Sequence, residues 1–228
     1  MYNRRRVMMG YVFLIPAAIL FFVFVAYPVF NTLRNSFYAL RIQTLTSGGK
    51  WIGLKNYLDM LKDEKMYQSL KFTLKFTVIA VALETVIGMA SALIMNQDFR
   101  GKTAVCAAIL IPWCIPTIVS SLMWSYMFAE SYGAINQFLN NLGLASRQWI
   151  TGSTDAFWAV IIADVWKTAP YMSLLLLSGL KTVPRDYYEA ASIDGAGSVY
   201  TFFHITVPLI KPVLLVAVTW VMGRGVTV

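Results

Sequence analysis

Long apolar runs separated by short polar segments extend along most of the chain. A membrane-spanning helix needs about 20 apolar residues, because each residue rises about 1.5 Å and the hydrocarbon layer is about 30 Å thick. Four runs meet this length, at residues 10–33, 76–97, 103–129 and 156–180. The first is longer than the apolar core of about 7–15 residues in signal peptides, so we expect it to be retained as a span.

A fifth apolar run starts near residue 209 but soon meets a charge, Arg224. The residues between Lys211 and Arg224 would cover only about 18 Å as a helix. We therefore expect an incomplete span at 209–228, as a frameshift, an early stop or a partial sequence would produce. The pattern predicts an all-α protein, a polytopic integral membrane helical bundle of about five spans, truncated, with residues 1–228 in a single transmembrane domain.

Two polar segments between the runs predict further structure. Residues 134–142 are expected to form a short helix that Gly143 ends, because glycine readily adopts the left-handed conformation found after helix C-termini. The longest gap, residues 31–75, is expected to hold a small lobe around residues 51–57.

Composition agrees with a membrane protein and argues against other classes. Hydrophobic residues make up 58% of the chain and charged residues only 13%, whereas soluble domains carry about 25% charged residues. The net charge of +8 does not indicate nucleic-acid binding, because the cations lie in the gaps between apolar runs. Cys106 and Cys114 would lie about 12 Å apart on one helix, beyond disulfide reach, and two thiols are too few for a zinc site.

Positive charges alone leave the orientation open. Cytoplasmic segments near span ends are enriched in lysine and arginine. The cluster Arg4–Arg6 and the short loop at 96–102 favour a cytoplasmic N-terminus, whereas Lys71 and Lys75 favour the opposite arrangement.

The polar segment at 181–208 predicts two short helices joined by a tight turn. Pro184 suits the first position of a helix, and Asp194-Gly195 suits its end. Ser198 is expected to cap the second helix. Small residues on such a hairpin would let its backbone approach another protein closely, although a plain surface hairpin between two spans would also fit these features.

The order of residues in this segment resembles a known family. Glu189-Ala190-Ala191, Asp194-Gly195-Ala196, Ile205-Thr206 and Pro208 resemble the "EAA" loop of binding-protein-dependent ABC permeases. Matches to the sugar-type branch, which includes maltose and glycerol-phosphate permeases, extend over about residues 10–216. They include Tyr27-Pro28, Gly53-Leu54, Asn56-Tyr57, Pro112-Trp113, Trp166-Lys167, Pro170, Gly179-Leu180 and Pro184.

This resemblance implies a type I ABC importer permease and its partners. They are a cytoplasmic ABC ATPase dimer, a second permease subunit, a periplasmic or lipid-anchored solute-binding protein and a carbohydrate-class solute. The loop at about 181–208 would seat in the ATPase and place the N-terminus in the cytoplasm of a bacterial or archaeal inner membrane. The implied coupling residues are Tyr187, Glu189, Ala190, Ala191, Asp194, Gly195, Ala196, Gly197, Ile205 and Pro208.

We expect a transporter subunit rather than an enzyme. The sequence has no G-x-x-x-x-G-K-[ST] phosphate-binding loop, so ATP and Mg are expected on the partner ATPase, with no cofactor, metal or catalytic residue in this chain. Rival interpretations are a membrane docking scaffold that moves no solute, an inactive truncated permease fragment, and a membrane enzyme that uses Glu84 or Asp164.

Charged and aromatic residues within the spans are candidates for the solute path. A charge in a span is costly and therefore either functional or paired. Asp164 and Lys167 are three residues apart on one predicted helix and are expected to pair with each other, either lining the path or joining helices. The candidates for the path are Glu84, Trp113, Trp124, Asp164 and Trp166, although tryptophan also collects at membrane interfaces and helix contacts.

Overall fold

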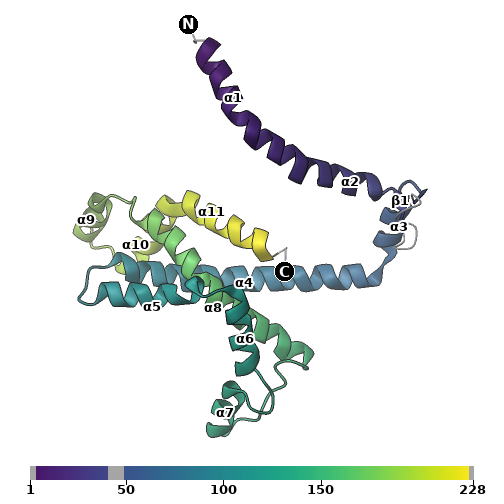
Figure 1. The fold of residues 1–228 in the computed structure, drawn as a ribbon. Helices are drawn as coiled ribbons and strands as arrows, with labels where there is room; N and C mark the ends of the chain where they lie inside the picture. Colours follow the sequence, from purple (N-terminus) through teal and green to yellow (C-terminus); the bar gives the residue numbers. More distant parts are fainter. Residues whose placement is uncertain (1–3, 41–48, 226–228) are drawn as a thin grey trace. The chain divides into compact units, whose positions relative to one another are not determined.

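The computed structural model describes residues 4–40 and 49–225. The chain divides into two compact units, Met1–Ser69 and Leu70–Val228. Apart from one pair of two-residue strands, the regular structure of the described residues is helical (Figure 1), so the all-α prediction is confirmed.

The first unit starts with a helical run that is long enough to cross a membrane. It comprises α1 (Arg4–Phe21), the π-helical segment η1 (Phe22–Ala26) and α2 (Tyr27–Asn35). Residues Met8–Asn35 satisfy the length and hydropathy of a span. The π-helical turn precedes Pro28, which has no N–H to continue the regular hydrogen-bond ladder.

A small lobe follows in the same unit. Strands β1 (Tyr38–Ala39) and β2 (Lys50–Trp51) pair antiparallel, and α3 spans Lys55–Lys62. The Asn56 side chain donates to the carbonyl oxygens of Ser36 (2.8 Å) and Tyr38 (3.1 Å), and so ties α3 to the strand. The lobe expected around residues 51–57 is therefore present.

The second unit is built on three long helical elements. They are α4 (Glu64–Asn96), most of which lies in this unit, α8 (Ser153–Leu180) and α11 (Val207–Gly225). Met172, Leu176 and Ile210 are completely buried where these elements meet. A Cβ atom on Gly88 of α4 would lie 2.5 Å from Cγ of Met172, so a small residue is required for this close helix contact.

The expected span at 103–129 is broken in the structure. It forms α5 (Lys102–Cys114) and α6 (Thr117–Met127), and their axes are bent by 93°. Pro116 disfavours helical backbone at the preceding residue, and Ile115 is indeed extended, with ψ 134°. The apolar pattern crosses this break without interruption, which explains why hydropathy alone predicts one helix.

The last helical run is longer than the sequence indicates. The sequence predicts a second hairpin helix from Ser198 toward Pro208 and a separate span from about 209, but α10 (Ser198–Thr201), the π-helical segment η3 (Phe202–Thr206) and α11 form one run. Residues Ser198–Arg224 have the length and composition of a span. The described residues thus contain four such helices, or five if the bent pair α5–α6 is one span.

The connection between α6 and α8 is organised by a buried amide. The short helix α7 (Ala134–Asn141) ends as expected at Gly143, whose φ is +75°. The Asn136 amide donates to the carbonyl oxygens of Glu130 (3.2 Å) and Arg147 (3.0 Å). Its Oδ1 accepts from the Trp149 indole (2.9 Å) and the Arg147 backbone N–H (3.0 Å), so all four hydrogen-bonding positions of this buried side chain are used.

Candidate functional site

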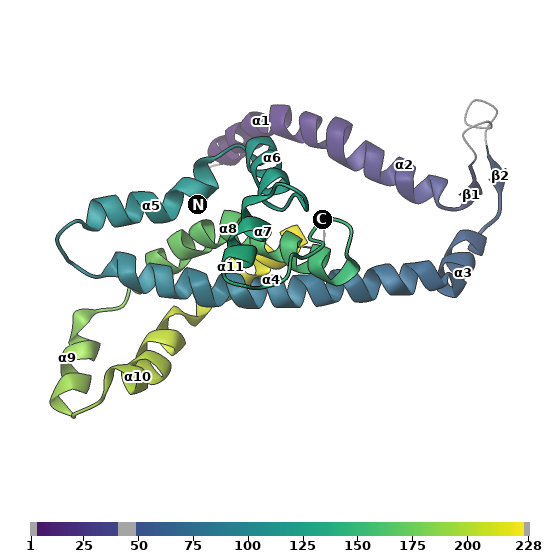
Figure 2. The same cartoon turned by 90° about the horizontal axis from the view of Figure 1, so that it is seen from below.

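The predicted hairpin projects from one end of the second unit. Figure 2 shows α9 (Arg185–Ile193) and α10 at the end where α4 and α5 are joined. The turn between them is a complete Schellman motif: Ala196 N–H donates to the Ala191 carbonyl (2.9 Å) and Gly195 N–H to the Ser192 carbonyl (3.2 Å). Gly195 has φ +75°, a conformation that glycine adopts without strain, so the expected Asp194-Gly195 turn is confirmed.

The starts of the two hairpin helices differ from the expectation. Pro184 is the residue before α9 rather than its first helical residue. Ser198 does not cap α10: it is the first helical residue, and Gly197 stands at the N-cap position without a side-chain hydrogen bond. The second helix therefore begins one residue earlier than a cap at Ser198 would require.

Small residues of the hairpin line a cleft of about 610 Å³. Eight of the ten residues implied by the resemblance contribute to it, whereas Glu189 is exposed outside it and Pro208 lies in α11. The sequence interpretation missed Tyr200, which lines the cleft with its ring stacked on His204 at 4.0 Å. The spacing of these two rings, four residues apart on a predicted helix, was the available signal.

One side of the hairpin packs against the helices of the second unit, and the other side is exposed. Tyr188 packs against the buried cluster formed by α4, α8 and α11, and its hydroxyl lies 3.2 Å from Oγ1 of Thr206. By contrast, Tyr187 is 50% exposed and Ile193 is 86% exposed. An apolar surface beside a cleft of small residues is suited to contact with another protein.

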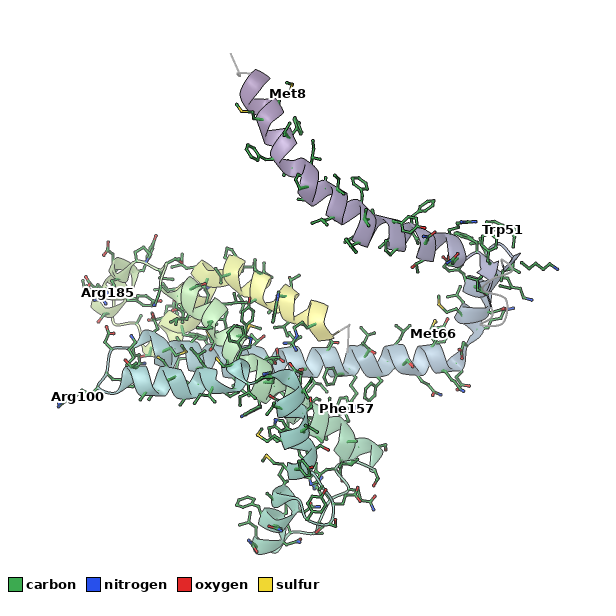
Figure 3. The ribbon with its side chains drawn as sticks, in the orientation of Figure 1. Met8, Trp51, Met66, Arg100, Phe157 and Arg185 are labelled. Atoms are coloured by element: carbon green, nitrogen blue, oxygen red, sulfur yellow. The ribbon has the colours of Figure 1, made fainter. Side chains whose placement is uncertain are left out.

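Basic residues gather at the same end of this unit. Figure 3 shows Arg100, between α4 and α5, at the end of the unit where Arg185 starts α9. Nearby, Lys102 forms an ion pair with Asp98 (2.9 Å). The hydrogen bond from Lys102 and its positive charge hold the pKa of the Asp98 carboxyl below its usual value, and Arg185 adds a smaller effect in the same direction.

Glu84 and Asp164 lie near each other between α4, α8 and α11. Glu84 is 1% exposed, and the Thr168 hydroxyl donates to its Oε1. Its Oε2 has no hydrogen-bond partner among the described residues. Glu84, Asp164, Thr168 and Arg224 all border one small cavity.

The expected pair between Asp164 and Lys167 is not formed. Lys167 instead extends its ammonium group to the end of α5, where it donates to the carbonyl oxygens of Pro112 (3.1 Å), Trp113 (3.3 Å) and Ile115. The two charged residues of α8 therefore contact different helices, because Lys167 faces α5 whereas Asp164 faces α4 and α11.

The candidate tryptophans form two separate aromatic groups. Trp113 stacks on Tyr171 at 5.4 Å, and Tyr171 also contacts Trp220 at 4.3 Å. Trp124 of α6 meets Trp166 of α8 edge to face at 5.5 Å. Within the described ranges, no three His, Cys, Asp or Glu side chains come together as metal ligands.

Sequence comparison assigns the chain to a family. Residues 84–227 match the family described as binding-protein-dependent transport system inner membrane component. The chain is 42% identical over 213 residues to the trehalose/maltose transport system permease protein MalF of Thermococcus litoralis, covering 93% of this chain and 72% of that protein. It is 38% identical over 206 residues to the sulfoquinovosyl glycerol transport system permease protein SmoG of Agrobacterium fabrum, covering 90% and 66%. The chain belongs to this permease family, and the resemblance to its sugar-type branch is confirmed.

Structure comparison gives the same fold. The chain superposes with a TM-score of 0.82 and 22% identity on a chain from the crystal structure of a bacterial ABC transporter involved in the import of the acidic polysaccharide alginate. The match covers 98% of this chain and 75% of that chain. This protein is therefore a membrane protein with the fold of an ABC importer permease.

Proposed function

We propose that this chain is the permease subunit of an ATP-driven importer for a carbohydrate-class solute. The observation that carries the proposal is the glycine-turned hairpin, with its cleft of small residues, at one end of a membrane helical bundle. The names of the relatives support the solute class, since they specify trehalose, maltose and sulfoquinovosyl glycerol.

The hairpin would seat in a cytoplasmic ATPase that holds the ATP and Mg. Its exposed Tyr187 and Ile193 supply apolar contact, and the backbone beside Ala190 and Gly195 is open to close approach. This docking places the hairpin and the N-terminus in the cytoplasm. The cations near Arg100 and Arg185 lie at that same end, which agrees with the enrichment of positive charge on the cytoplasmic side.

Two further partners complete the importer. We expect a second permease subunit and a periplasmic or lipid-anchored binding protein. A structure similar to this chain contains a transporter in complex with an alginate pentasaccharide-bound periplasmic protein, which supports a partner of that kind.

ATP-driven closure of the ATPase would move the hairpin as a lever. Tyr188 links α9 to Thr206 in η3, and η3 continues directly into α11. Displacement of the hairpin is therefore passed to a helix that packs on α4 and α8 in the membrane. The solute path would use the polar and aromatic residues Glu84, Trp113, Trp124, Asp164 and Trp166.

Transport by the reconstituted importer tests this function. The permease pair, ATPase and binding protein in proteoliposomes should take up a maltose-type oligosaccharide and show solute-stimulated ATP hydrolysis. Glu189→Lys should abolish uptake while ATP hydrolysis persists, whereas the control Asp59→Lys, the same change of charge on exposed α3, should transport normally. ATP hydrolysis without uptake by the unsubstituted complex would favour a scaffold, and normal uptake by Glu189→Lys would contradict the docking assignment.

A further inference from the structure

The break between α5 and α6 removes hydrogen-bond donors from the end of α5. In a continuous helix, the N–H of residue 116 would donate to the carbonyl of residue 112. Pro116 has no N–H, and extended backbone at Ile115 turns the following N–H groups away from α5. Backbone carbonyls inside a membrane need a partner within the protein, because lipid offers none.

Lys167 supplies the missing donors from a neighbouring helix. Its ammonium group has three N–H bonds, and it donates to the three carbonyls of Pro112, Trp113 and Ile115. The carbonyl end of a helix also carries a partial negative charge, which favours a cation at this place. The Lys167 ammonium group is therefore bound by three backbone carbonyl oxygens at the break.

The same contact lies between the two aromatic groups. Trp166, next to Lys167 on α8, meets Trp124 of α6, whereas Tyr171, one turn further along, stacks on Trp113 of α5. Both half-helices are thus held against α8 on either side of the ammonium group. Pro116 breaks the helix, but without the ammonium group the carbonyl end of α5 would lack these donors and α5 would lose a contact that holds it against α8.

We propose that Lys167 is a positioning residue whose ammonium group fixes the α5–α6 break and, with it, the aromatic residues that border the solute path. Its relation to transport rests on the proposed function, but its effect on the break does not. A free alkylammonium ion should be able to bind the same three carbonyl oxygens when the Lys167 side chain is shortened.

Crosslinking tests the geometry without requiring transport. In a Cys106→Ser, Cys114→Ser background, Trp113→Cys and Tyr171→Cys should be joined by a short bifunctional thiol reagent in the purified subunit. Adding Lys167→Met should lower the crosslinking yield at least about fivefold, because methionine has similar length but no donor. Lys71→Ala, the loss of an exposed lysine on α4, is the matched control and should leave the yield unchanged.

Chemical rescue then distinguishes the ammonium group from simple packing. Lys167→Ala lacks the atoms of a propylammonium ion. We therefore expect n-propylammonium to restore the crosslink in the cysteine variant and to restore uptake in a complete importer that keeps Trp113 and Tyr171. Tetramethylammonium, which has no N–H, should restore neither. An unchanged crosslink with Lys167→Met, or no rescue by n-propylammonium, would overturn the proposal. A variant that fails to accumulate unless n-propylammonium is present would support it. Absence of uptake by the unsubstituted importer would contradict the proposed function alone, because the crosslink is read independently.

Discussion

The hairpin turn permits a quantitative prediction, because its strain can be separated from its packing. Gly195 has φ +75°, and a Cβ atom added there would meet no atom within 4 Å. The cost of Gly195→Ala is therefore that of left-handed backbone for a residue with a side chain, about 1–2 kcal/mol. Valine should cost more, since branching at Cβ makes a positive φ rarer still, and asparagine should cost less.

This strain should weaken docking of the ATPase. If the docked complex requires the turn, Gly195→Ala should raise the Kd of the solubilised permease for the ATPase by up to about 5- to 30-fold. Gly197→Ala is the matched control: Gly197 has φ −69° and equally open space, and it lines the same cleft. Its Kd should rise less than that of Gly195→Ala, because it adds the same methyl group to the cleft without backbone strain.

Two results would refute this reasoning. Equal weakening by Gly195→Ala and Gly197→Ala would mean that bulk in the cleft matters rather than the turn. Equal weakening by Gly195→Asn and Gly195→Val would mean that the φ of this residue is irrelevant to docking. Titration calorimetry with the purified ATPase gives both comparisons.

Two further predictions concern the loops. Asn136→Leu should destabilise the protein by about 2–4 kcal/mol, because it leaves buried groups, including the Trp149 indole, without hydrogen-bond partners. Thermal unfolding in detergent measures this loss. A midpoint equal to that of the unsubstituted protein would contradict the prediction. The pKa of Asp98 is lower in the folded protein than in the unfolded chain, where it is about 3.9. The ion pair therefore stabilises the folded protein fully above that unfolded pKa, and this stabilisation is lost as the pH falls through the folded pKa. Lys102→Met should raise the Asp98 pKa toward its ordinary value, as carboxyl NMR titration would detect, and an unchanged pKa would show that the pair is not formed in solution.

Local features allowed much of this protein to be inferred from its residues. Apolar runs of sufficient length can cross a membrane only as helices here, and Gly143 and Asp194-Gly195 end their helices through backbone preferences that act over a few residues. The order of residues around Glu189-Ala190-Ala191 also carried the family resemblance. These signals do not depend on how the helices pack.

Packing decided the remaining features. Asp164 and Lys167 have a spacing that permits a pair, yet Lys167 binds the end of α5, because its partners are 52–55 residues away in the chain and are exposed only by the break at Pro116. The second hairpin helix and the last span are one helical run from Ser198 rather than two elements, since η3 joins α10 to α11 without a break. Which face of a helix meets which neighbour is a long-range property, so spacing along one helix cannot choose between a partner on that helix and a better one on the next.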